Sequence, residues 1–309
     1  MAGIHLNLLN TTSFNVHRYG WSYATGHLSS LHFDGGIILD DFIEKTHSWS
    51  VDYNLVPYRK EWIGFFHNPH NMPKWFDYHN SPQNIISSEL FQESLKNCRC
   101  LVALSDYLKS WLETQVSVPV ISLKHPTGSP NKLWSKHEFT RNKKIVQVGY
   151  WLRNMSEIYK LKIDLPKYWL PSNKEYAQFL FEIENRLNNT AYSKDKSVII
   201  PSRLSNEDYD NFLSSSVVLL NLYDSSANNA VIECIARNTP MIINKHPAVV
   251  EYLGENYPLY CDFSKNNPLE FLSMAKIMSA EEYLRSMDKE FLNGENFAYE
   301  LYYKLSRIV

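Results

Sequence analysis

Polar residues that could bind an anion gather directly behind one short apolar run. The run is Val217–Leu222, which has the length and the β-branched start of a buried strand. The polar residues of the following loop are Asp224, Ser225, Ser226, Asn228 and Asn229. Apolar residues at helical spacing then begin at Ala230 and stop before Pro240. The loop therefore ends at a helix N-terminus, where backbone N–H groups favour an anion such as a diphosphate.

Glu233 lies one turn inside this predicted helix. The position suits a carboxylate that reaches a sugar hydroxyl beside the bound phosphate. An ordinary surface residue is the alternative for Glu233, and simple N-capping is the alternative for Asn228. Met241–Ile243 begins the next buried strand, so strands alternate with helices here. This alternation predicts parallel βαβ units, which bind ligands beyond the carboxyl ends of their strands.

The stretch from Glu233 to Ile243 resembles the donor-site segment of GT-B glycosyltransferases, in particular the retaining group called glycosyltransferase family 4 or group 1. Its sequence, ECIARNTPMII, has a helix Glu, an Ala, a Pro and an apolar strand in the family's order. The resemblance implies that Glu233 binds the ribose of a nucleotide. Members of the family carry a second Glu, facing the donor sugar, at the position where this chain has Ser225.

A second set of candidate residues follows the predicted strand Lys144–Tyr150. The resemblance implies a Gly at this strand end, then an Arg and a Lys that clamp the donor diphosphate. Gly149 fits the glycine, and Arg153 fits the Arg because its planar fork suits two phosphate oxygens. Lys160 is the candidate Lys, and a solvated basic helix face is the alternative. The predicted donor-binding residues are Gly149, Arg153, Lys160, Tyr223, Asp224, Ser226, Asn228, Asn229, Ala230 and Glu233.

The segment HNPH begins at His67, the last residue of a third predicted apolar strand, Trp62–His67. We expect His67, Asn68 and His70 on the acceptor side, with His67 and Arg153 as the catalytic pair. A His there can bind a sugar hydroxyl or, if the enzyme inverts, act as the general base. A metal site formed by His67 and His70 lacks a third ligand nearby. The resemblance also implies no catalytic metal and no cofactor besides the nucleotide-sugar substrate.

The whole pattern predicts an α/β protein, and the resemblance implies two Rossmann-like domains that face each other across a cleft, with C-terminal helices. We expect an acceptor-side domain over residues 1–130 and a donor-binding domain over 143–290. A terminal helix over 291–309 is expected to cross back to the first domain. The polar, turn-rich stretch Thr127–Asn142 is the expected linker.

The individual elements follow from local patterns. Predicted strands are Ile4–Leu9, Gly35–Leu39, Trp62–His67, Cys100–Leu104, Val118–Leu123, Lys144–Tyr150 and Ser197–Ile200. Predicted helices are Ser88–Asn97, Asp106–Thr114, Asn173–Leu187, Asn206–Ser215 and Pro268–Met278, followed by terminal helices broken near Asn293.

Composition bounds the class of protein. The chain has 309 residues, of which 44% are hydrophobic, enough for two cores. A net charge of −2 gives no nucleic-acid footprint. No apolar run is long enough to span a membrane, and no leader pattern is evident, so we expect a cytoplasmic protein. The four cysteines form no metal-binding spacing and suit reduced structural thiols. The oligomeric state stays open.

The predicted function is glycosyl transfer from a nucleotide sugar to a hydroxyl of a glycan or other acceptor, with retention and without a metal. One alternative is a catalytically silent GT-B module that binds a sugar, a nucleotide or a partner protein. Ser225 favours this alternative because it replaces the second Glu of the resembled family. Another is a different GT-B enzyme class, such as a nucleotide-sugar epimerase or a phosphorylase. A phosphorylase would need a lysine site for pyridoxal phosphate, and no segment marks one.

Overall fold

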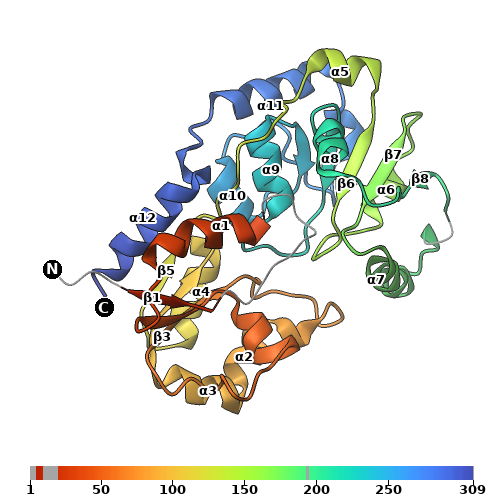
Figure 1. Cartoon of the computed structure of the whole chain (residues 1–309). Helices are drawn as coiled ribbons and strands as arrows, with labels where there is room; N and C mark the ends of the chain where they lie inside the picture. Colours follow the sequence, from red (N-terminus) through yellow and green to blue (C-terminus); the bar gives the residue numbers. More distant parts are fainter. Residues whose placement is uncertain (1–4, 10–19, 193–194, 309) are drawn as a thin grey trace. The chain divides into compact units, whose positions relative to one another are not determined.

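The computed structural model describes residues 5–9, 20–192 and 195–308 (Figure 1). The chain divides into two units. Unit 1 comprises Met1–Gly128, Ser225–Ala227 and Lys289–Val309, and unit 2 comprises Ser129–Asp224 and Asn228–Asp288. Each unit contains one five-stranded sheet of parallel strands.

No helix within these described ranges has the length and apolar character that crossing a bilayer requires.

The strands of unit 1 follow one another across the sheet in chain order. They are β1 (Leu6–Leu8), β2 (Ile37–Asp40), β3 (Trp62–Phe66), β4 (Cys98–Ala103) and β5 (Val120–Ser122). β3 lies at the centre and is buried along its whole length, which explains its continuous apolar sequence. Because parallel pairing aligns the strands' carboxyl ends, residues that follow β2 and β3 come together at one edge of the sheet.

Separate hydrophobic cores cover the two faces of this sheet. Along β3, Ile63 and Phe65 belong to one core, whereas Trp62 and Phe66 belong to the other. The alternation follows from the two-residue period of a strand. All four of these side chains are fully buried, so both faces of the sheet are covered.

The first of these cores is closed by two helices from opposite ends of the chain. α12 (Gly294–Leu305) lies against α1 (Gly20–Leu28), as Figure 1 shows. α12 contributes Leu301 and Leu305, both 0% exposed, to the core that also holds Ala24 of α1. The C-terminal helix is therefore part of unit 1.

The other helices of unit 1 begin at serine caps. They are α2 (Pro82–Ser87), α3 (Glu89–Leu95) and α4 (Asp106–Gln115), with the short helical turns η1 (Ser29–Leu31), η2 (Lys45–Trp49), η3 (Tyr78–Asn80) and η6 (Glu290–Leu292). Ser81, Ser88 and Ser105 each accept a backbone N–H of the helix that follows. The cap of α4 is thus Ser105.

The sheet of unit 2 has a strand order with a switch point. Its strands are β6 (Ile145–Val148), β7 (Lys167–Leu170), β8 (Val198–Ile199), β9 (Val217–Leu220) and β10 (Met241–Ile243), in the order β10-β9-β6-β7-β8. From β6 the chain moves outward to β8, then returns to place β9 on the other side of β6. The two loops that leave β6 and β9 thus diverge, and in doubly wound sheets ligands bind at that place.

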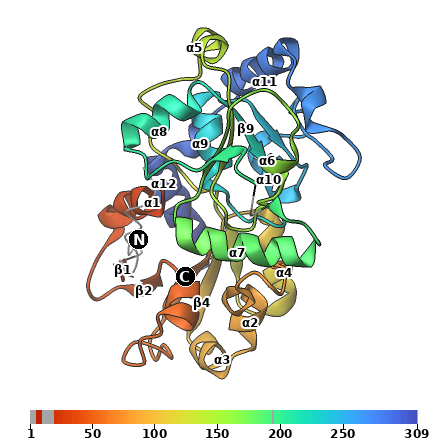
Figure 2. The same ribbon diagram turned by 90° about the vertical axis from the view of Figure 1, so that its right-hand side faces the viewer.

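The helices of unit 2 connect these strands. They are α6 (Glu157–Lys160), α7 (Lys174–Leu187), α8 (Asn206–Leu213) and α9 (Asn229–Arg237). Outside the crossovers lie α5 (Lys136–Arg141), α10 (Pro247–Leu253), η5 (Pro268–Phe271) and α11 (Met274–Ser286). α8 and α9 lie side by side in both views (Figures 1 and 2). All nine residues of α9 except Asn229 are buried, so its N-terminus is held in a fixed place.

Most predicted elements are confirmed to within a few residues. Ile4, the expected first residue of strand β1, lies outside the described residues. The helix expected at Pro268–Met278 is wrong in its extent: a short 3₁₀ turn ends at Phe271, and Ser273 then caps α11 by accepting the N–H of Lys276 at 3.4 Å. Such a cap starts a new helix because its own backbone is extended.

Several elements of the structure, α2 and α6 among them, were not expected from the sequence. α1 and β7 were missed, and α5 lies inside the expected linker. β7 contains Lys167, which is buried and whose Nζ donates to the Leu161 carbonyl at 3.0 Å. Because a charged residue interrupts the apolar run, the hydrophobic pattern does not predict this short strand. α5 forms because Trp134 and Phe139 are buried beside it, which a polar segment does not reveal.

Candidate functional site

The loops that leave the switch point in unit 2 are joined by backbone hydrogen bonds. After β6 the chain turns at Gly149, whose φ of +74° lies in the left-handed region. An antiparallel bridge then joins Arg153 to Leu222 beyond β9. The N–H of Asn154 donates to the Asn221 carbonyl at 2.7 Å. These bonds fix the loop, so its side chains are presented in a set direction.

Arg153 forms no direct ion pair with a carboxylate among the described residues. The residue is 8% exposed. Its Nη1 donates to the Trp151 carbonyl at 2.7 Å, and its Nη2 donates to Asn228 Oδ1 at 2.9 Å. Its Nε is buried and has no hydrogen-bond partner in that part of the chain. Burial lowers the pKa of Arg153 to about 10, so the guanidinium stays charged at neutral pH. A buried charge without a direct ion-pair partner is costly, which favours an anionic ligand here.

Gly149 is required at this turn for two reasons, its positive φ and the lack of room for a side chain. A Cβ at Gly149 would lie 3.0 Å from Cζ of Arg153 and 3.1 Å from its Nη1. Both distances are shorter than ordinary van der Waals contact. Gly149 therefore acts by leaving room for the guanidinium, and its role in ligand binding would be indirect.

The guanidinium reaches the N-terminus of α9. Asn228 is the N-cap, and its Oδ1 accepts the N–H groups of Ala230 at 3.1 Å and Val231 at 3.4 Å. The same oxygen accepts from Arg153, so one carboxamide joins the buried cation to the positive end of the helix. The helix dipole and the guanidinium add to each other, and both favour negative charge.

Glu233 lies beside this cation and is held by a residue that the sequence analysis missed. It is 5% exposed, and the Tyr209 hydroxyl of α8 donates to its Oε2 at 2.6 Å. Burial, and then the neighbouring carboxylate, raise the pKa of Tyr209 well above its usual value, so the phenol remains a donor. Tyr209 and Glu233 both act electrostatically on Arg153. No local pattern marks Tyr209, because its partner Glu233 lies on another helix.

A buried ion pair connects the two helices that carry these residues. Arg237 of α9 donates from Nη2 and Nε to Asp210 Oδ1 of α8, at 2.6 and 3.1 Å. Arg237 also donates from Nη1 to the Glu233 carbonyl at 3.1 Å. Because charge-assisted bonds are directional, this pair fixes α8 against α9 and so fixes Tyr209 against Glu233.

The remaining expected donor residues next to β9 have other partners. Tyr223 hydrogen-bonds Glu184 of α7. Asp224 is 2% exposed, and its Oδ1 lies 2.8 Å from Nε2 of His246, the N-cap of α10. Ser226 groups with unit 1, where its hydroxyl lies 3.3 Å from that of Ser105.

Lys160 does not join Arg153, Asn228 and Glu233, which we call the Arg153 cluster. Its Nζ lies 3.3 Å from Glu157 Oε2, and both residues line a pocket that none of Arg153, Asn228 and Glu233 lines. Among the expected donor residues, the structure therefore brings together Gly149, Arg153, Asn228, Asn229, Ala230 and Glu233.

In unit 1, His67 follows β3 and is enclosed by aromatic rings. It stacks on Phe42 with ring centroids 3.9 Å apart and meets the edge of Trp21 at 4.4 Å. Its Nε2 lies 3.0 Å from the Asp41 carbonyl, so Nε2 carries the proton. Burial lowers the pKa of His67 to about 3, which keeps the imidazole neutral and makes it a weak base.

A buried carboxyl group holds the backbone at this strand end. Glu44 is 0% exposed, and its Oε1 accepts the N–H groups of His67 at 2.7 Å and Asn68 at 2.6 Å. Burial raises the pKa of Glu44 to about 8. Asn68 also donates from Nδ2 to the Asn80 carbonyl at 3.0 Å. His70 stacks in parallel on Trp111 at 5.1 Å. These partners give the HNPH segment a defined conformation.

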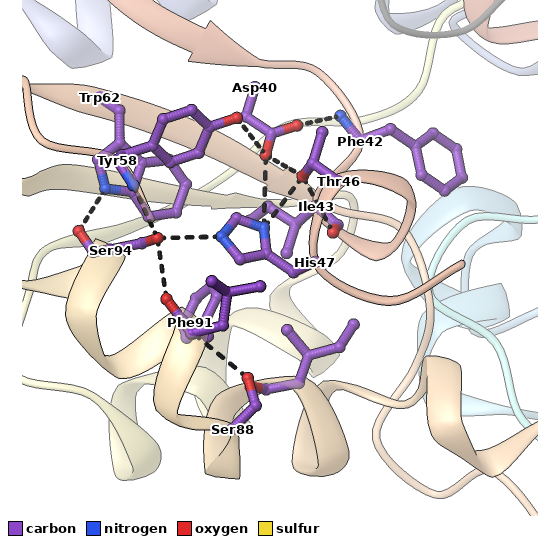
Figure 3. Close-up of polar contacts among 12 residues, drawn as sticks. Asp40, Phe42, Ile43, Thr46, His47, Tyr58, Trp62, Ser88, Phe91 and Ser94 are labelled. Carbon is purple, nitrogen blue, oxygen red and sulfur yellow. Dashed lines mark hydrogen bonds and ion pairs between the residues drawn. The ribbon is translucent and has the colours of Figure 1, made fainter. Parts of the chain in front are cut away.

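A polar network surrounds His47 in unit 1 (Figure 3). His47 Nε2 lies 3.2 Å from Ser94 Oγ, and His47 Nδ1 lies 3.7 Å from Asp40 Oδ2. The order Ser, His, Asp resembles a nucleophilic triad. Ser94 is 0% exposed, however, and its hydroxyl donates to the Leu90 carbonyl at 3.0 Å. We therefore interpret the network as a structural one.

The comparisons with known proteins concern the fold. No protein-family model matches the sequence, and no curated protein matches it significantly. Solved structures do match. Sucrose-phosphate synthase from Thermosynechococcus elongatus aligns with a TM-score of 0.61 at 13% identity, over 93% of this chain and 76% of that one. Trehalose-6-phosphate synthase from Burkholderia multivorans aligns with a TM-score of 0.54 at 11% identity, over 94% and 79%.

A third similar structure is that of Anabaena HepE in complex with UDP and glucose. It aligns with a TM-score of 0.58 at 10% identity, over 80% of this chain and 72% of that one. These likenesses, with the two parallel sheets, confirm the expected α/β class with two Rossmann-like domains of the GT-B type. The narrower resemblance to family 4 stays a prediction.

Proposed function

We propose that this protein transfers a glycosyl group from a nucleotide-sugar donor to an acceptor hydroxyl. The observation that carries the proposal is the buried Arg153, charged and without a carboxylate partner among the described residues, at the N-terminus of α9. A diphosphate supplies the anion that this arrangement lacks. The fold likeness to a protein solved with UDP and glucose supports a nucleotide sugar as the source of that diphosphate.

The cluster in unit 2 suggests a role for each of its groups. Arg153 and the α9 N-terminus would offset the charge that builds on the leaving diphosphate, which is electrostatic catalysis. We propose that this assistance replaces a catalytic metal. Glu233 would accept hydrogen bonds from the ribose, and Tyr209 would hold its carboxylate in place. Retention of the anomeric configuration, with the leaving phosphate taking the acceptor proton, is the stereochemical outcome that we propose.

His67 suits acceptor binding better than proton abstraction. A base whose pKa burial lowers to about 3 has little affinity for a proton at neutral pH. Its neutral ring can still hydrogen-bond a hydroxyl. The exposed Trp49, whose ring lies 6.0 Å from that of Phe42, extends the aromatic surface from His67 outward. Aromatic faces stack on the apolar faces of sugar rings, so we propose a carbohydrate acceptor.

Ser225 favours a second candidate function, a silent module that binds the nucleotide sugar without transfer. Ser225 stands where the resembled family has an acidic residue, it is 5% exposed, and it groups with unit 1. Such a module would bind the donor and release no nucleotide.

The test is thermal stabilisation by UDP, GDP, ADP and CMP, each with its nucleotide sugars, for the wild type and Glu233→Ala. A ligand at about 100 times its Kd stabilises the folded state by about 2.7 kcal/mol. We expect one base to stabilise the wild type selectively and the shift to disappear in the variant. Glu207→Ala, an exposed change on α8, is the matched control and should keep the full shift.

The donor so identified is then incubated with simple glycosides, and release of nucleoside diphosphate is followed. Acceptor-dependent release supports transfer, whereas binding without release supports the silent module. If no nucleotide stabilises the wild type, the donor-site assignment is wrong.

A further inference from the structure

A pocket lies within unit 2, apart from the residues of the Arg153 cluster. It has a volume of about 720 Å³. Asn221 and Asn244, which follow β9 and β10, line it together with Glu157 and Lys160 of α6. The segment from Tyr260 to Ser264 forms the remaining wall. The size is that of a small-molecule site.

The lining residues are held in place by their own hydrogen bonds. Asn244 joins the end of β10 to the end of β9 by two hydrogen bonds. Its Oδ1 accepts the Leu222 N–H at 2.8 Å, and its Nδ2 donates to the Leu222 carbonyl at 3.0 Å. Asn221 Nδ2 donates to Glu157 Oε2 at 2.7 Å. The Tyr260 hydroxyl donates to the Gly254 carbonyl at 2.8 Å. A pocket with a fixed lining loses little entropy when a ligand binds.

The charges around the pocket cancel pair by pair. Lys160 lies 3.3 Å from Glu157, and Lys245 lies 2.7 Å from Glu255. Asp262 is paired with Lys265 at 3.0 Å. No cation or carboxylate is therefore left over for a charged ligand. A neutral ligand fits this balance better than a phosphate or an ammonium group.

Hydrogen-bonding capacity remains in spite of these pairs. Asn154 lines the pocket, and its buried Oδ1 has no partner among the described residues. Glu157 uses only Oε2 for its protein partners there, which leaves Oε1 as an acceptor. A buried polar atom without a partner costs free energy, and a ligand hydroxyl would remove that cost. Tyr260 and Phe263 add aromatic rings to the lining.

We propose that this pocket is a second carbohydrate site that binds a neutral sugar unit. Carboxamide groups donate to and accept from sugar hydroxyls, and carboxylate oxygens accept from them, so together they recognise neighbouring hydroxyls. Aromatic rings cover the apolar face of a sugar. The site is independent of the donor-site proposal, because none of Arg153, Asn228 and Glu233 lines it.

The test uses the methyl glycosides of glucose, galactose, mannose and N-acetylglucosamine as probes, with binding followed by saturation-transfer NMR and titration. We expect millimolar binding of at least one glycoside to the full-length wild type. Asn154→Ala and Glu157→Gln should each weaken it at least about tenfold, as the loss of one hydrogen bond to a fixed partner predicts. Asn206→Ala, on the exposed surface of unit 2, is the control and should bind normally.

Arg153→Met separates this site from the donor site. Glycoside binding that survives in Arg153→Met and falls in Asn154→Ala supports the pocket. Binding that falls in Arg153→Met but survives in both pocket variants places the sugar at the Arg153 cluster and overturns the proposal. Absence of binding by all four glycosides, or competition by inorganic phosphate, overturns it as well.

Discussion

Arg153 indicates a function because burying its charge costs free energy of folding. Charged groups that are buried are usually paired. Arg153 is 8% exposed, stays charged, and donates only to a backbone carbonyl and a carboxamide among the described residues. A protein that keeps such a charge without a ligand gives up stability at that site, and binding of an anion recovers it.

This cost leads to a prediction for Arg153→Met. The methionine keeps the apolar stem and removes the buried charge, so the free energy of unfolding without ligand should fall by less than about 1 kcal/mol or even rise. Affinity for the nucleoside diphosphate should fall at least about 30-fold, because charge-assisted bonds to the ligand are lost. Denaturant unfolding and nucleotide titration measure the two effects.

Arg186→Met, on the exposed surface of α7, is the matched control and should change neither quantity. A loss of several kcal/mol in Arg153→Met without ligand would show instead that the guanidinium is structural.

At the scale of elements, short helical turns and strand ends are joined by buried carboxyl groups. Glu44, next to η2, holds the backbone N–H groups at the end of β3. Asp40, at the end of β2, accepts from Thr46 and Tyr58. Desolvation raises the pKa of Asp40 to about 6 and that of Glu44 to about 8. Both carboxyl groups therefore bind protons more tightly in the folded protein than in the unfolded chain.

The sign of the pH dependence follows from these shifts. A raised folded pKa contributes stability that is full below the ordinary pKa and is lost as pH rises through the folded value. For Glu44 this contribution to stability is lost as the pH rises from 4.5 to about 8. The histidines His47 and His67 act in the opposite direction, since burial lowers their pKa values to about 4 and about 3. Their contribution is lost only as pH falls below 6.5, the ordinary value.

Between pH 6.5 and 8, Glu44 is thus the group of this set that changes the stability of unit 1. We expect wild-type stability to fall by about 1 to 2 kcal/mol across this window and Glu44→Gln to remove most of that fall. Thermal unfolding at a series of pH values measures it. Glu113→Gln on α4 should follow the wild type, and an identical slope in Glu44→Gln would contradict the assignment.

At the scale of the molecule, each unit has its own sheet and its own buried apolar residues, and the chain passes between the units more than once. α12 returns to unit 1 and buries Leu301 and Leu305 in the core that α1 closes. The last helix is thus needed for the first unit, although the two are at opposite ends of the sequence.

Leu301→Ala should therefore lower the stability of unit 1 by about 2 to 5 kcal/mol, the range for truncating a buried leucine. Hydrogen exchange should increase in α1 and leave β9 and α9 of unit 2 protected, because these belong to a different core. Tyr299→Ala on the exposed face of α12 is the control and should cost less than about 0.5 kcal/mol. Equal loss of protection in both units would show that they unfold as one.

The sequence by itself determined the elements with strong local patterns. β3 and β9 are continuous apolar runs, and Asn228 and Ser205 are caps at predicted helix starts. Those patterns also placed Arg153, Asn228 and Glu233 near strand ends, because parallel strands present their carboxyl ends at one edge. Such information is local, so a single window of sequence contains it.

Only the tertiary structure decided which of these residues meet. Tyr209 reaches Glu233 and Asp210 reaches Arg237 because α8 packs against α9, and no sequence period encodes that pairing. Lys160 lies on α6 with Glu157 and lines a pocket that Arg153 does not line. α5 and β7 depend on the burial of Trp134 and of a paired Lys167, which the neighbouring residues do not reveal. Side-chain partners across elements are set by packing, and packing is a property of the folded chain as a whole.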